Sequence, residues 1–144
     1  MAPLLVLVVV AGLTRLAGWG HLGHWPDSWP HAVRLGLAAM LVLTASAHFL
    51  QPRRDALIAM VPPRLPSAAM LVTLTGVLEL AGAAGLLIPP VAPAAAICLA
   101  LLMIALFPAN IRAARGDLGI KSMPLPLRGA VQVLFLGACV LAAL

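Results

Sequence analysis

Five long apolar runs dominate the sequence, and they are separated by short gaps in which proline and polar residues gather. A transmembrane helix needs about 20 predominantly apolar residues to cross the hydrocarbon core of a bilayer. The five runs come close to this length, the first being the shortest. They comprise residues 3–19, 31–50, 67–88, 91–110 and 127–144. Consecutive prolines such as Pro62 and Pro63, or Pro89 and Pro90, favour breaks between helices at the gaps.

The composition indicates that lipid covers these runs. The chain is 63% hydrophobic and 9% charged, whereas soluble domains have roughly 45–50% apolar and about 25% charged residues. A chain of 144 residues leaves much of its surface outside, so it cannot bury all of these side chains in a core. The runs are too long for barrel strands and show no alternation of period two. We therefore predict an all-α transmembrane helical bundle that forms one domain over residues 1–144.

The first run has a second interpretation, a cleaved signal peptide. No basic segment precedes it, its only arginine (Arg15) lies near its far end, and no A-x-A cleavage site follows it. We therefore favour a retained helix, and a protein with four spans is the alternative.

The distribution of basic residues predicts the orientation in the membrane. The second and fourth gaps and their borders hold most of the basic side chains, namely Arg53, Arg54, Arg64, Arg112, Arg115, Lys121 and Arg128. The first gap is flanked only by Arg15 and Arg34, and the third gap has none. Cytoplasmic loops carry an excess of Lys and Arg. We therefore expect a multi-pass protein of the cell membrane with its N-terminus in the cytoplasm and its C-terminus outside.

The polar gaps also predict where the membrane surface lies. Residues 55–61 are largely apolar between basic neighbours, so we expect this segment in the interface with the arginines toward lipid headgroups. Trp19, Trp25 and Trp29 surround the first gap, as an aromatic belt would. The net charge of +5 does not indicate nucleic-acid binding, because the basic residues are scattered and form no stripe with aromatics.

The cysteines and histidines do not indicate a metal or thiol centre. Cys98 and Cys139 lie in apolar runs without a CxxC spacing, and we interpret both as buried structural residues. His21, His24 and His31 border the first gap but include no i,i+4 pair that would favour a metal site. We likewise find no ligand pattern for haem, an iron–sulfur cluster or flavin.

Glu79 is the most unusual polar residue, because it lies near the middle of the third run. A charge at that depth costs about 2.5–3.5 kcal/mol on insertion scales, so such residues usually pair and often carry function. Gly76, Gly82 and Ala83 share its helical face and would let another helix approach closely. We expect Glu79 to face the interior of the bundle. Two interpretations stay open: a structural ion pair or protonated carboxyl that locks helices, and a proton-handling or ligand-binding group.

Further polar residues are candidate ligand-binding or proton-handling groups, and they are Arg34, His48, Thr75, Asn110 and Gln132. Arg34 and His48 are fourteen residues apart, close to four helical turns, and therefore share a face. For His48 we favour a structural role as a helix-end histidine bonded to a carbonyl. Asn110 follows Pro108 at the end of the fourth run, where we favour a helix C-cap. We predict no catalytic residue.

Four short motifs in order resemble a family. They are HFxxP at residues 48–52, VPxxLP at 61–66, GxxExxG at 76–82 and PAN at 108–110. Residues 34–142 resemble DoxX-like integral membrane proteins through these motifs. The resemblance implies a four-helix transmembrane core, to which the first run adds a helix that packs on its side. Relatives have been linked to quinone-coupled sulfur oxidation, to redox partners and to receptor assembly. The CxxC of some redox bundles is absent here.

Three functional hypotheses follow. The first is an accessory or redox-associated subunit that binds a quinone or small lipophilic ligand within the bundle, with a membrane or peripheral redox protein supplying electrons. The second is a non-catalytic assembly factor or scaffold for another membrane protein. The third is a transporter of protons or a small solute, for which a homo-oligomer would supply the wall of a pore. None of the three makes the chain an enzyme on its own.

Overall fold

The structure is a computed structural model of the chain, and it describes residues 2–19, 28–115 and 123–144. These residues form helices and no strand. The helices are α1 (Ala2–Trp19), α2 (Trp29–Phe49), α3 (Arg53–Met60), α4 (Ala68–Leu86), α5 (Ala92–Ala114) and α6 (Leu125–Ala143). All except α3 are long and apolar enough to cross a membrane. The predicted all-α bundle with five candidate spans is therefore confirmed.

Capping and proline residues explain where the helices begin. The Ser28 hydroxyl accepts a hydrogen bond of 3.3 Å from the backbone N–H of His31 and so caps α2. Prolines lie in the first turn of α2, α5 and α6, where the missing N–H would have no partner inside the helix. The observed boundaries lie within a few residues of the predicted ones.

The end of α5 differs from the prediction. The fourth run was expected to end at Asn110, but α5 continues through Pro108 to Ala114. A proline in a soluble helix usually breaks it, whereas transmembrane helices tolerate proline when neighbouring groups satisfy the freed backbone. Arg112 therefore lies inside the helix and not in a loop.

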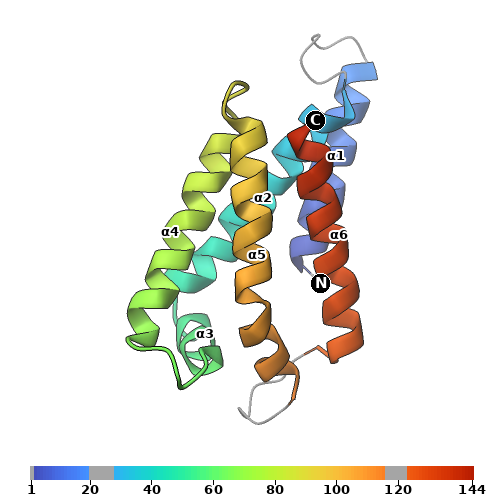
Figure 1. Ribbon diagram of the computed structural model, residues 1–144. Coiled ribbons are helices and arrows are strands. Elements are labelled where there is room, and N and C mark those ends of the chain that lie inside the picture. The colour runs from blue at the N-terminus through green and yellow to red at the C-terminus, as the bar shows by residue number, and fades with distance from the viewer. Residues whose placement is uncertain (1, 20–27, 116–122) are drawn as a thin grey trace.

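Four helices form a ring in which each packs against the next. The order around the ring is α2, α4, α5 and α6, and α6 packs against α2 to close it (Figure 1). α1 packs against α2. α2 holds the largest share of buried residues, because it contacts α1, α3, α4 and α6. The short helix α3 lies at one end of the ring and packs against α2, α4 and α5. We call this end of the bundle the α3 end.

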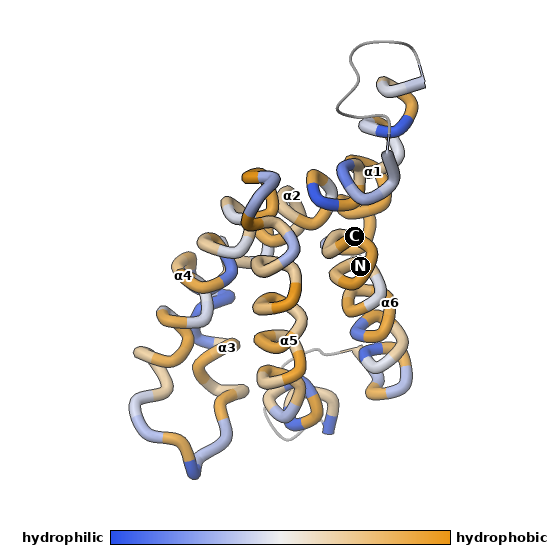
Figure 2. The backbone as a smooth tube through the Cα atoms, turned by 45° about the horizontal axis from the view of Figure 1, so that its top comes forward, coloured by the Kyte–Doolittle hydropathy of each residue, from blue (hydrophilic) through white to orange (hydrophobic). Residues whose placement is uncertain are grey.

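Large apolar side chains cover the outer surfaces of the helices. Val8 of α1, Leu101 and Ile104 of α5, and Val133 and Val140 of α6 are all exposed. Hydrophilic residues lie mainly near the ends of the helices (Figure 2). A soluble protein rarely exposes contiguous apolar surface on this scale, so the arrangement is that of a multi-pass membrane protein.

Small residues let α4 approach both of its neighbours. Gly76 faces α2, where a Cβ atom would lie 2.6 Å from the Cβ of His48. Gly82 faces α5, where a Cβ atom would overlap the side chain of Leu99. Ala83 is buried between them. The small-residue face predicted around Glu79 is therefore a packing surface in the fold.

Candidate functional site

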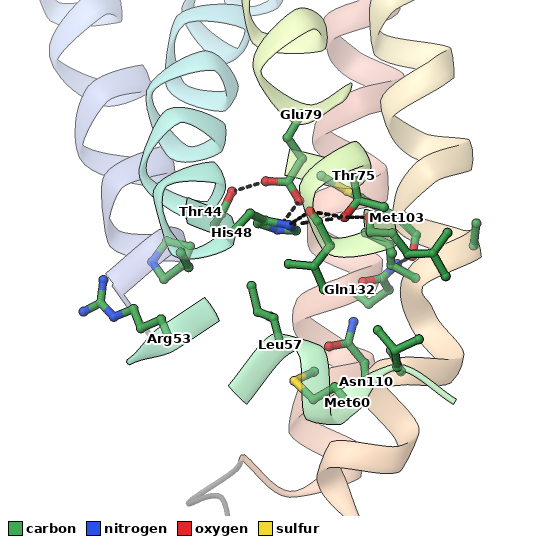
Figure 3. A pocket seen from close by; sticks show the side chains of 18 of the residues that line it. Thr44, His48, Arg53, Leu57, Met60, Thr75, Glu79, Met103, Asn110 and Gln132 are labelled. Atoms are coloured by element: carbon green, nitrogen blue, oxygen red, sulfur yellow. Dashed lines mark hydrogen bonds and ion pairs between the residues drawn. The ribbon is translucent and has the colours of Figure 1, made fainter. Parts of the chain in front are cut away.

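A cavity of about 770 Å³ lies inside the bundle toward the α3 end. The α3-side halves of α2, α4, α5 and α6 contribute its walls, and α3 with the following segment lies across its end (Figure 3). Most of the lining is apolar, from residues such as Met40, Leu57 and Phe135. A largely apolar cavity with a few convergent polar groups is the usual form of a site for a small organic ligand.

Glu79 and His48 form the polar centre of this cavity. His48 Nε2 lies 3.4 Å from Glu79 Oε1, and the two side chains are 9% and 12% exposed. The other carboxylate oxygen, Oε2, accepts a hydrogen bond of 2.9 Å from the Thr44 hydroxyl. The prediction that Glu79 faces the bundle interior is confirmed, and His48 is its ionisable neighbour.

Hydrogen bonding to His48 shows which of its ring nitrogens carries a hydrogen. His48 Nδ1 lies 2.8 Å from the Val72 carbonyl oxygen, which can only accept, so Nδ1 carries a hydrogen. If Nε2 and the carboxyl both lacked a proton, a lone pair would face a carboxylate. The geometry therefore suits one proton between Nε2 and Oε1. Either an imidazolium faces a carboxylate, or a protonated carboxyl donates to a neutral imidazole.

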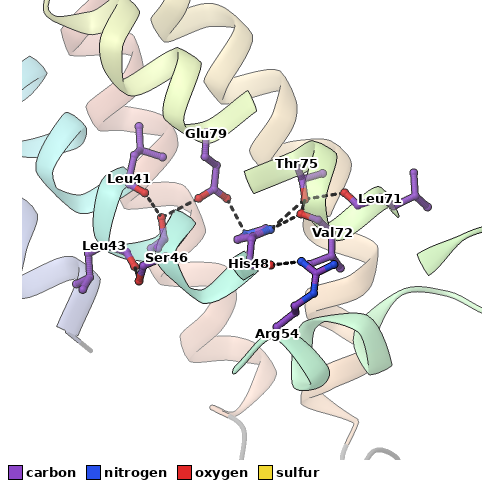
Figure 4. A network of polar contacts seen from close by, with 10 residues as sticks. Leu41, Leu43, Ser46, His48, Arg54, Leu71, Val72, Thr75 and Glu79 are labelled. Carbon is purple, nitrogen blue, oxygen red and sulfur yellow. Dashed lines mark hydrogen bonds and ion pairs between the residues drawn. The ribbon is translucent and has the colours of Figure 1, made fainter. Parts of the chain in front are cut away.

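Thr75 completes the network without becoming a nucleophile. Its hydroxyl lies 3.2 Å from His48 Nδ1, which superficially places Thr75, His48 and Glu79 in the order of a catalytic triad (Figure 4). However, the hydroxyl lies 3.0 Å from the backbone carbonyls of Leu71 and Val72, to which it donates. Since Nδ1 carries a hydrogen, it cannot take a proton from Thr75. Thr75 therefore helps to position His48.

A second group of polar residues lies on the α5 and α6 wall of the cavity. Arg128 Nη1 donates a hydrogen bond of 2.7 Å to Asn110 Oδ1. Gln132 Nε2 donates one of 2.9 Å to the Met103 carbonyl oxygen. The expectation that Asn110 is a helix C-cap is wrong, because Arg115 is the residue that caps α5. Asn110 instead joins α5 to α6 and lines the cavity.

Arg34 is the one predicted site residue that does not line the cavity. Its buried side chain donates a hydrogen bond of 2.8 Å from Nε to the carbonyl oxygen of Ala142. The last carbonyls of a helix have no partner within the helix, so this bond satisfies the end of α6. Arg34 therefore joins α2 to α6 at the end of the bundle opposite α3.

The arginines beside α3 also differ from the prediction. Arg54 was expected to point toward lipid headgroups, but its guanidinium donates to the His48 carbonyl and, over 3.0 Å, to the Thr73 hydroxyl. Arg112 likewise donates to the Val61 carbonyl. A buried carbonyl without a partner is costly, which explains why these two side chains turn inward. Arg53 is exposed at the cavity rim.

Two residues of the site, Thr44 and Arg128, were not among the site residues predicted from the sequence. Thr44 lies four residues before His48 and therefore on the same face of α2. Arg128 lies four residues before Gln132 on α6. The i,i+4 spacing to a predicted site residue was the signal available for both. His48 is bonded to a carbonyl near the end of a helix, as predicted, but it also reaches Glu79.

The remaining polar predictions have mixed outcomes. Cys139 is buried as expected, but Cys98 is exposed on α5, and both are free thiols. His31 contacts the Ser28 hydroxyl. Arg15 stacks over the rings of Trp19 and Trp29, at 5.2 and 5.5 Å from their centroids. The predictions for His21, His24, Trp25 and Lys121 lie outside the described residues.

Comparison with known families places most of the chain in one of them. Residues 37–140 match the family described as a domain of unknown function (DUF8561). The search of curated proteins and the search of solved structures found no match. The matched region begins within α2 and includes all the cavity residues named above, whereas α1 lies outside it. The chain therefore belongs to the DUF8561 family.

Proposed function

We propose that this protein binds a small lipophilic molecule with a hydrogen-bonding head, a quinone being the leading candidate, and serves as an accessory subunit of a membrane redox system. The observation that carries the proposal is the His48–Glu79 pair, which offers a proton inside a largely apolar cavity. A quinone carbonyl accepts a hydrogen bond, and its reduction consumes protons. The pair would hold the head and exchange a proton with it, while a partner protein would supply the electrons.

The resemblance to DoxX-like proteins supports the same cavity as the functional site. Residues from all four motifs that carry the resemblance contribute to its lining: His48, Pro62, Glu79 and Asn110. These positions are scattered over more than sixty residues of sequence, yet they converge on one place. We propose that the protein is a distant DoxX-like member with a four-helix core made of α2, α4, α5 and α6.

The orientation in the membrane is a further part of the proposal. Among the described residues, the α3 end carries Arg53, Arg54, Arg64, Arg112, Arg115 and Arg128. The positive-inside rule assigns this end to the cytoplasm, so the N-terminus would be cytoplasmic and the C-terminus outside. The cavity would then lie toward the cytoplasmic leaflet of the cell membrane.

Transport is less well supported than binding. Beyond Glu79, toward the end opposite α3, the interior is filled by buried side chains including Leu37, Leu86 and Leu99. A transporter needs access to its site from both sides, and close-packed side chains of this size leave no room for water or solute. The packing favours a site that is open toward one side.

The decisive test is ligand binding by the purified protein. Lipophilic molecules extracted from wild-type protein would be identified by mass spectrometry, and the affinity for a short-chain benzoquinone would be measured by titration calorimetry. Glu79→Gln should weaken binding by about tenfold, since it removes the carboxyl that shares a proton with His48 and about 1.4 kcal/mol corresponds to tenfold. Asp55→Asn makes the same chemical change outside the cavity lining and should have no effect.

Two results would overturn the proposal. One is equal affinity for the quinone in wild type and Glu79→Gln. The other is the absence of quinone binding in both proteins. A redox partner that co-purified with them would then support an accessory role without a ligand.

A further inference from the structure

At the α3 end of the cavity, α3 is attached to some of the surrounding helices more firmly than to others. α3 packs against α2, α4 and α5. Arg54 ties it to the His48 carbonyl of α2 and the Thr73 hydroxyl of α4, and Arg112 of α5 holds the Val61 carbonyl just after it. These bonds attach α3 and the residue that follows it to α2, α4 and α5, which form three walls of the cavity. The fourth wall, α6, stands on the remaining side.

α2 and α6 separate as they approach the α3 end. At the opposite end they are joined by the Arg34–Ala142 hydrogen bond and by buried apolar residues. α2 then crosses the bundle toward α4, while α6 runs down the other side (Figure 1). Leu43 and Ala47 of α2 and Phe135 of α6 line the cavity and are only half-buried. Pro3 of α1 also lines the cavity, which places the first turn of α1 beside it.

We propose that the cavity is reached sideways from the lipid, through an opening between the α3-side halves of α2 and α6 beside the start of α1, and that its ligand is a membrane lipid with an uncharged head and a long chain. This proposal rests on the proposed function and gives it a route and a ligand class. The head would hydrogen-bond with His48 and Glu79, and the chain would extend through the opening into the leaflet.

The depth of the polar pair argues for an uncharged head. Glu79 is eleven residues beyond the first residue of α4, a rise of roughly 16 Å at about 1.5 Å per residue. This is about half of a hydrocarbon core of about 30 Å. A charged head would have to be drawn to that depth, which costs several kcal/mol, and an anion would also face the Glu79 carboxyl. A hydroxyl or carbonyl head avoids both costs.

Photo-crosslinking in lipid nanodiscs tests the route with the full-length chain. The probe is a hexadecanol that carries a diazirine within its chain, and mass spectrometry locates the adducts. Two comparison probes are hexadecanoate with the same diazirine and a water-soluble short-chain alcohol with a diazirine. For wild type we expect hexadecanol adducts on cavity residues, and fewer from either comparison probe.

Variants at the opening provide the matched comparison. Ala47→Trp places a bulky ring in the α2 wall and should reduce cavity adducts by about tenfold, as expected for a loss of about 1.4 kcal/mol in binding. Val42→Trp makes a large substitution on the exposed face of the same helix and should change nothing. Phe135→Ala widens the opening from the α6 side and should increase the adducts, so the proposal stays testable if Ala47→Trp does not fold.

The outcomes separate the route from the proposed function. Cavity labelling that depends on Glu79 but responds to neither Ala47→Trp nor Phe135→Ala overturns the sideways route. Stronger labelling by the short-chain alcohol than by hexadecanol also overturns the sideways route, in favour of access from water. Stronger labelling by hexadecanoate than by hexadecanol overturns the proposal that the ligand has an uncharged head. Labelling that responds to the opening variants but not to Glu79→Gln supports the route and removes the proposed role of the polar pair.

Discussion

Gly76 of α4 lies directly against His48 of α2, so close that a side chain on Gly76 would overlap the Cβ and Cγ atoms of the histidine. This close approach brings His48 within 3.4 Å of Glu79, which lies one turn further along α4. The glycine therefore sets the distance between the two ionisable groups of the cavity.

Gly76→Ala should push α2 and α4 apart at the cavity. Overpacking of a tight interior site costs roughly 1–3 kcal/mol, which SDS-induced unfolding in mixed micelles would measure as a loss of stability. Gly137→Ala is the control, because no atom lies within 4 Å of a Cβ at that position. There, alanine should raise stability by up to about 1 kcal/mol through its higher helix propensity. Equal effects of the two substitutions would contradict the close contact.

His48 and Glu79 should be energetically coupled. We expect a double-mutant cycle with His48→Ala and Glu79→Ala to give a coupling free energy of about 1–3 kcal/mol, since residues in one polar network are not additive. Arg34→Ala with Glu79→Ala provides the control cycle. Arg34 bonds to α6 and not to the cavity network, so those two substitutions should add to within about 0.5 kcal/mol. Full additivity in the first cycle would contradict an interaction between the two side chains.

Arg34→Met should loosen the last turn of α6. The substitution keeps an apolar stem but leaves the Ala142 carbonyl without its donor, which costs about 1–3 kcal/mol for a buried polar group. Hydrogen–deuterium exchange should accelerate at the end of α6 and at the start of α2, while exchange in α4 stays unchanged. Arg115→Met, at an exposed arginine, should leave all three regions as in wild type. Unchanged protection of α6 in Arg34→Met would refute the bridging role.

The proposed orientation can be tested with single cysteines. Ser67→Cys lies at the α3 end, and Pro90→Cys lies in the connection between α4 and α5 at the opposite end. On intact cells, a membrane-impermeant maleimide should label Pro90→Cys, and it should label Ser67→Cys only after the cells are permeabilised. The native thiols would be measured first in the wild-type chain. The reverse pattern would invert the topology and place the cavity toward the outer leaflet.

The predictable part of the fold comes from hydropathy and local spacing. The apolar runs determined the five long helices to within a few residues, since backbone groups in lipid must bond within their own helix. The small residues around Glu79 were enough to predict that its helical face points into the bundle, because helical periodicity fixes which residues share a face. Both inferences depend only on neighbours along the chain.

The less predictable part depends on how the helices are rotated against one another. Local spacing does not determine which of Arg34, His48 or Gln132 meets Glu79, because that choice depends on packing between distant segments. Arg34 bonds to a backbone carbonyl 108 residues away, and a carbonyl has no signature in sequence. Thr44 was overlooked because a hydroxyl in an apolar run commonly bonds to its own helix, and here it reaches the Leu41 carbonyl as well as Glu79.

The central position of α2 has a consequence for biosynthesis. Chains emerge from the ribosome N-terminus first, so α2 is made before the segments that satisfy its polar side chains. His48 must wait for Glu79 of α4, and Arg34 must wait for Ala142 near the end of α6. A nascent chain therefore holds the Arg34 side chain in an incomplete bundle until α6 has been made, and the His48 side chain until α4 has been made. The second helix can reach its mature surroundings only after residue 142 has been translated.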